Sequence, residues 1–101
     1  MNYQLTIVTP SGKIFDDQVE ALMVPGVAGE LGVLAGHIPM VNALKPGAVK
    51  VTQDKQEKFF AIASGILEVN KEHQVLLLTN DAQSVSNREE ARERALTLEK
   101  S

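Results

Sequence analysis

The chain has 101 residues, 44% hydrophobic and 23% charged, with no cysteine and a formal net charge of −3. This length and composition indicate one domain with one modest aliphatic core and argue against a disordered chain. The acidic balance and the lack of a basic stripe argue against nucleic-acid binding, and the missing cysteines exclude disulfides, thiolate metal sites and thiol nucleophiles.

The amino-terminal quarter alternates apolar and polar residues in the way that half-buried β-strands do. Residues 3–9 show this alternation, and a Pro-Ser-Gly turn ends it. Further strands are expected over residues 13–15 and 19–24, separated by a turn at Asp16 and Asp17. Proline cannot donate to a ladder, so Pro25 should close the last of these strands.

The most unusual stretch is GELGVLAGHIP, residues 29–39, which combines three glycines with Glu30 and His37. Glycine permits positive φ or a close backbone approach, so we expect a short strand between two tight loops. Such a stretch favours a contact surface over a catalytic one.

The middle of the chain continues the strand pattern. Residues 40–44 are apolar, but their conformation is left open, whereas Lys45-Pro46-Gly47-Ala48 predicts a type II turn. The strands expected after it are 49–52, 58–63, 66–69 and 74–79, with a polar loop at 54–57 and a bulge or bend at Ser64-Gly65. Residues 59–63 are apolar on both faces, which indicates a central strand. The spacing of these short strands predicts a β-sandwich or flattened barrel over residues 1–85.

The carboxyl-terminal segment, residues 86–101, has the pattern of one short helix. Ser86 as N-cap and Glu89 as its capping-box partner predict a helix from residue 87 to about residue 99. Its apolar stripe consists of Ala91, Ala95 and Leu98. A stripe this thin predicts that the helix either packs against the sheet or frays.

No catalytic, metal or phosphate motif stands out, and no cofactor is predicted. His37 lies outside any nucleophile elbow, and His73 is most simply a solvated loop residue. Glu30 and His37 are isolated polar groups, and no Lys-Ser or Lys-Thr follows the glycines. A small β-barrel that uses Glu30 and His37 to bind a metal or ligand stays as one alternative, and a scaffold with an unrelated partner as another.

Three blocks taken together, residues 29–39, 43–47 and 64–69, resemble the epsilon subunit of the rotary F-type ATP synthase. The resemblance covers roughly residues 2–85. It implies a noncatalytic, ten-stranded sandwich in the rotor's central stalk, beside the gamma subunit and on the c-ring. Such a subunit helps to couple ion flow through the ring to ATP synthesis in the catalytic head.

The matching positions imply two contact surfaces. Those toward the polar loops of the c-ring are Glu30, Leu31 and Gly32, and those toward gamma are His37, Ile38, Pro39 and Met40. A purely structural role is the alternative for Glu30. Membrane association is expected through the complex only, at the cytoplasmic face of a bacterial inner membrane or the stromal face of a thylakoid. The absence of a transit peptide favours a bacterial or plastid-encoded chain.

The carboxyl end departs from the family pattern. Members commonly continue into a two-helix hairpin that can inhibit ATP hydrolysis and can reach the catalytic head. In some members an aspartate and an arginine there help to bind ATP, but Asn87 and Glu90 occupy those positions here. An acidic residue has the wrong sign for phosphate. With one helix before Ser101, we expect a short form or a truncated chain, with inhibition and ATP sensing weakened.

Overall fold

The computed structural model describes residues 1–99, which form ten β-strands followed by one helix. The elements are β1 (Tyr3–Thr9), β2 (Gly12–Val19), β3 (Ala21–Gly26), β4 (Gly29–Leu34), β5 (Met40–Leu44), β6 (Gly47–Gln53), β7 (Gln56–Ile62), β8 (Gly65–Val69), β9 (Val75–Thr79), β10 (Ala82–Val85) and α1 (Arg88–Glu99). The last two residues of the predicted carboxyl-terminal segment, 100 and 101, lie outside the described part.

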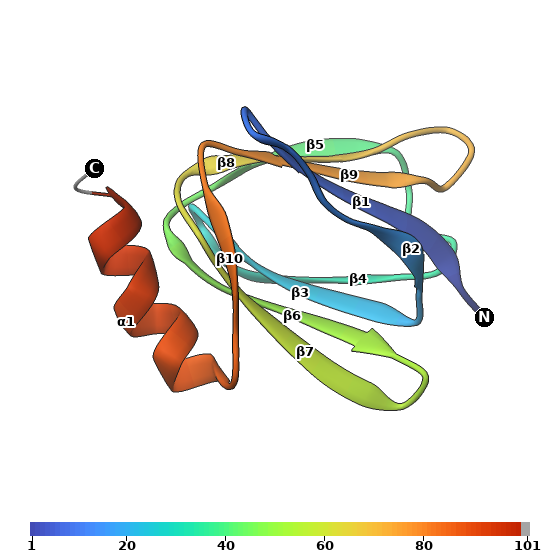
Figure 1. The fold of residues 1–101 in the computed structure, drawn as a ribbon. Coiled ribbons are helices and arrows are strands. Elements are labelled where there is room, and N and C mark those ends of the chain that lie inside the picture. Colours follow the sequence, from blue (N-terminus) through green and yellow to red (C-terminus); the bar gives the residue numbers. More distant parts are fainter. Residues whose placement is uncertain (100–101) are drawn as a thin grey trace.

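The strands form one sheet in the order β10-β7-β6-β3-β5-β8-β9-β1-β2, with β4 paired to β3. All pairs are antiparallel except β1 with β9. Between β3 and β5 the ladder holds one residue pair, Gly26 with Leu44, and there the sheet folds over on itself. One layer is then β4, β3, β6, β7 and β10, and the other is β5, β8, β9, β1 and β2 (Figure 1). The predicted class, a ten-stranded sandwich or flattened barrel with one short helix, is confirmed.

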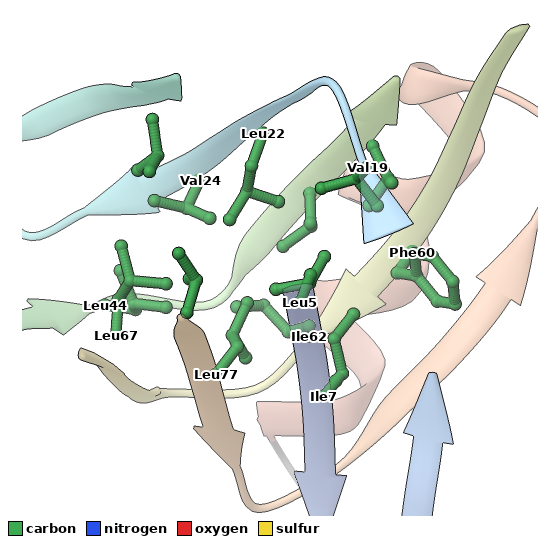
Figure 2. Close-up of a cluster of buried hydrophobic side chains, with 14 of the residues drawn as sticks. Leu5, Ile7, Val19, Leu22, Val24, Leu44, Phe60, Ile62, Leu67 and Leu77 are labelled. Carbon is green, nitrogen blue, oxygen red and sulfur yellow. The ribbon is translucent and has the colours of Figure 1, made fainter. Parts of the chain in front are cut away.

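The core lies between these layers and is mostly aliphatic, with Tyr3 and Phe60 as its buried aromatic side chains. Each strand points alternate side chains inward, so that Leu5 and Ile7 of β1 and Val24 of β3 are fully buried in one cluster (Figure 2). The other side chains labelled there are Val19, Leu22, Leu44, Phe60, Ile62, Leu67 and Leu77. This single packed interior is what holds the surface segments in place.

One predicted turn and one predicted strand end are wrong. Asp16 and Asp17 lie inside β2, where Asp16 Oδ1 accepts hydrogen bonds from Gln4 and Thr6 of the neighbouring β1. These cross-strand partners make the acidic pair part of a ladder, and the chain bends after Val19 instead. Pro25 does not close its strand, since β3 runs on to Gly26.

The predicted type II turn at residues 45–48 is also wrong. That turn needs a positive φ at Gly47, but the positive-φ glycines are Gly12, Gly29 and Gly36. Gly47 begins β6, where a Cβ atom would lie 2.8 Å from Cβ of Pro25. The small residue is needed for close packing at this position. The segment left open, residues 40–44, forms β5.

The helix packs on the sheet, and its start differs by one residue from the prediction. Asn87 is the cap: its Oδ1 accepts a 2.8 Å hydrogen bond from the Glu90 amide, while Glu90 Oε1 accepts one from the Ser86 amide. The predicted pair of Ser86 and Glu89 is therefore wrong. Ala91, Ala95 and Leu98 are buried against Ala61 and Ala63 near the end of β7. This contact explains why residues 59–63 are apolar on both faces, and it confirms the covered central strand.

Candidate functional site

The glycine-rich stretch forms the expected short strand between tight turns. Gly29 has φ +135° and Gly36 has φ +80°, conformations that side chains rarely adopt. Gly32 has an ordinary backbone, and a Cβ there would sit 3.7 Å from Cε of Met23. At about 3.3 Å per residue, β4 separates its two ends by about 17 Å. The two predicted contact surfaces therefore lie at opposite ends of one strand (Figure 1).

At the first end of β4, Glu30 pairs with Pro25 across the ladder and its side chain is 56% exposed. Its Oε2 lies 3.8 Å from Nη1 of Arg88, the first residue of α1. Leu31 points inward and packs partly against the core, whereas Gly32 is exposed. Of the three residues predicted to face the c-ring, Glu30 and Gly32 lie at the surface.

At the other end, residues 35–39 connect β4 to β5. Ile38 is 71% exposed and Pro39 is exposed, whereas His37 is half-buried and Met40 packs partly against the core. Nδ1 of His73 lies 3.3 Å from the His37 carbonyl oxygen and donates to it when that nitrogen carries the proton. The predicted gamma segment is thus supported by the loop between β8 and β9.

A third surface feature, an exposed apolar face, was not predicted from the sequence. The outer face of the β5-β8-β9-β1 layer carries a cross-strand row of apolar side chains, fixed by the register of three strand pairs. The row consists of Ala43, Ile66, Leu78 and Val8. Ile66 is 47% and Leu78 43% exposed, and Val41 of β5, 69% exposed, lies on the same face. We call these five residues the apolar row.

The two layers differ in what covers their outer faces. Helix α1 packs on β6, β7 and β10 of one layer, and within residues 1–99 no element packs over the apolar row of the other (Figure 1). An open hollow of about 570 Å³ adjoins this row, between Pro10 and Asn80. The signal in the sequence is that Ile66 and Leu78 occupy strand positions where a solvated face would be polar.

The pKa values of Tyr3 and Asp16 are shifted, and both groups serve the structure. Burial raises the pKa of the Tyr3 phenol well above its usual range. Hydrogen bonds from Lys13, then Thr6 and Gln4, lower the pKa of the Asp16 carboxyl. Asp16 is exposed and lies on β2, outside the stretch of residues 29–40.

The geometry does not favour the metal-binding alternative. Glu30 and His37 occupy opposite ends of β4, too far apart to share one ion. Over residues 1–99, no three His, Cys, Asp or Glu side chains come together as metal ligands would. What the arrangement provides chemically is one exposed carboxylate and one exposed apolar face.

Comparison with known proteins gives a consistent result. The family model of the ATP synthase delta/epsilon chain beta-sandwich domain matches residues 2–85. The ATP synthase epsilon chain of Bacillus licheniformis is 39% identical over 98 residues, which covers 96% of this chain and 72% of the relative. That of Bacillus subtilis is 40% identical over 74 residues, covering 73% and 56%.

Solved structures agree with this result. A chain in the mitochondrial ATP synthase of Euglena gracilis, in a structure that includes the c-ring, superposes with a TM-score of 0.79 at 28% identity. The match covers 98% of this chain and 62% of that one, so this chain spans less than two thirds of the Euglena chain. A chain from the central stalk and c-ring of the Tetrahymena thermophila enzyme has a TM-score of 0.71 at 13% identity and supports the fold alone.

Proposed function

The chain belongs to the ATP synthase delta/epsilon chain family, and from this membership we propose that it is a central-stalk subunit that joins gamma to the c-ring. In this role it is a noncatalytic part of an enzyme complex and helps to couple ion flow through the ring to ATP synthesis. No helix within residues 1–99 is long and apolar enough to cross a membrane. The subunit is held at the membrane by the complex, on the side where ATP is made.

The observation that carries this proposal is the uncovered apolar row on one face of the sandwich. Contiguous exposed apolar side chains on a small domain mark a surface that a protein partner covers. We assign gamma to this face. Val41 continues the row toward Met40, the last residue of the His37–Met40 segment that the family resemblance assigns to gamma. Ile38 and Pro39 supply the exposed part of that segment.

The c-ring is assigned to the other end of β4. Glu30 carries a negative charge at this end of the strand. It lies next to the β3–β4 turn, in which Val27 is 60% exposed. A carboxylate at this position suits pairing with basic groups of the ring's polar loops. Because Leu31 packs partly into the core, the contact is made by Glu30 and Gly32 rather than by all three predicted residues.

The test is binding to the gamma subunit of the same organism, measured for the full chain and for two matched variants. Ile66→Asp places a charge in the middle of the apolar row and should weaken gamma binding at least tenfold. Leu96→Asp places the same charge on α1, where Leu96 is 69% exposed, and should bind as wild type does. If the wild-type chain does not bind gamma at micromolar concentration, or if both variants bind as tightly as wild type does, the assignment is overturned.

A further inference from the structure

A charged contact joins α1 to the strand that carries Glu30. Arg88 Nη1 lies 3.8 Å from Glu30 Oε2, and neither side chain is fully exposed. Arg92, one turn further along α1, lines a hollow of about 220 Å³ together with Glu30 and Lys45. Glu30 therefore shares its surroundings with two arginines of the helix and one lysine that follows β5.

The position of Arg88 is not explained by the helix itself. The first turn of a helix favours acidic side chains, and a cation there opposes the helix dipole. Arg88 and Arg92, four residues apart on the helix, also repel each other. The carboxylate of Glu90 is engaged by the Ser86 amide and by Arg94. The ion pair with Glu30 of β4 offsets the unfavourable interactions of Arg88 with the helix dipole and with Arg92.

The rest of the helix interface is thin. It consists mainly of Ala91 and Ala95 against Ala61 and Ala63, with Leu98 as its large buried side chain. One hydrogen bond, from Arg94 Nη1 to Gln83 Oε1 of β10, adds to it. Alanine methyl groups bury little apolar area, so apolar burial holds α1 to the sheet only weakly. A single ion pair can therefore change its docking equilibrium measurably.

We propose that docked α1 engages the carboxylate of Glu30 through Arg88, so that the helix competes with a basic partner for this carboxylate. Resting on the proposed function, that partner is the c-ring. While α1 is docked, Arg88 holds the Glu30 carboxylate, and both helix arginines repel a cationic group that approaches it. When α1 is released, Glu30 is free. By linkage, a partner that binds Glu30 also favours release of the helix.

The contact is tested on the isolated full chain by amide hydrogen exchange at Ala91 and Ala95. Glu30→Gln and Arg88→Gln should each speed exchange about two- to fivefold, as expected for a partly exposed ion pair. The double variant should exchange no faster than either single variant. On helix-dipole grounds alone, Arg88→Gln would slow exchange, so a faster rate identifies the tertiary contact.

A matched control removes an ion pair elsewhere. Lys13→Gln breaks the 3.1 Å pair between Lys13 and Asp16 on β2 and should leave exchange in α1 unchanged. Unchanged exchange in both single variants, or a double variant whose effect is the product of the two, would show that the pair does not hold the helix.

The regulatory step is tested by binding of the full chain to the c-ring in lipid vesicles. Ala95→Glu releases α1, because Ala95 is 1% exposed against the sheet, and should tighten binding about two- to fivefold. Leu96→Glu adds the same charge on the exposed side and should not. Adding Glu30→Gln to Ala95→Glu should remove the gain.

The outcomes separate the two proposals. If wild type and all variants fail to bind the ring while exchange shows the coupling, the assigned partner is wrong but the contact stands. If wild type binds the ring and Ala95→Glu does not tighten binding relative to Leu96→Glu, the regulatory inference is overturned and the proposed function stands.

Discussion

The hydroxyl of Tyr3 in β1 donates a 2.7 Å hydrogen bond to the carbonyl oxygen of Val33 in β4. The bond joins the two layers, since β1 belongs to one and β4 to the other. Within the described sheet β4 pairs with β3 alone, and its other edge is open. Buried backbone carbonyls require a partner, and here the partner is a side chain. The strand that carries Glu30 and leads into the His37–Met40 segment is thus held by β3 through its ladder and by β1 through this bond.

Tyr3→Phe should destabilise the fold by about 1–3 kcal/mol, because the buried Val33 carbonyl loses its donor while the ring still fills its place. Urea unfolding followed by circular dichroism measures this as a lower midpoint with an unchanged slope. A midpoint equal to that of wild type would mean that water replaces the hydroxyl.

Alkaline pH should unfold the protein through the same residue. The folded-state pKa of Tyr3 is raised by burial, so its contribution is complete below the unfolded-state pKa of about 10. That contribution is lost as pH rises from there toward the folded-state pKa. Tyr3 is the one tyrosine of the chain, so its absorbance follows the titration. In Tyr3→Phe, the decline in stability above pH 10 should shrink.

Gly65→Ala should destabilise the fold by about 1–3 kcal/mol through overpacking. A Cβ at this position would overlap the carbonyl oxygen of Leu78, which lies in a paired strand and cannot move freely. Gly32→Ala is the matched control, since its Cβ would make an ordinary 3.7 Å contact with Met23. Thermal unfolding should show a large loss for the first variant and at most a small change for the second.

Asn87→Ala should cost about 1 kcal/mol of helix stability, because Asn87 Oδ1 caps the Glu90 amide. Ser86→Ala should cost little, since the hydrogen bond to Glu90 uses the Ser86 backbone amide. Hydrogen exchange in α1 distinguishes the two variants. If Ser86→Ala sped exchange more than Asn87→Ala did, Ser86 would be the N-cap, as the sequence pattern predicts.

The sequence alone was sufficient for the class of fold and for most strands. Residues 3–9 alternate so regularly that the predicted strand has the same bounds as β1. The apolar run at 59–63 indicated cover on both faces, which α1 and the core provide. Three blocks of residues indicated the family. These features are local, because the period of a strand and the chemistry of a turn act over a few neighbouring residues.

Two predicted turns lie wholly or partly in strands instead, because tertiary partners override local preference. Asp16 and Asp17 are typical turn residues, yet donors on β1 keep Asp16 in a strand. The Pro46-Gly47 pair is typical of a type II turn, but β6 starts at Gly47, packed against Pro25. In both places the contacts come from another part of the chain.

By itself the sequence determined a mostly aliphatic β-sandwich with a short helix and the family of the chain. It also determined a short strand that carries Glu30 between glycine-containing turns. Only the tertiary structure decided that Ile66, Leu78 and Val8 form one exposed row, because register sets which side chains become neighbours across strands. It also decided that Glu30 meets Arg88. No local pattern encodes a pair so far apart in the chain, and folding the sheet into two layers brings them together.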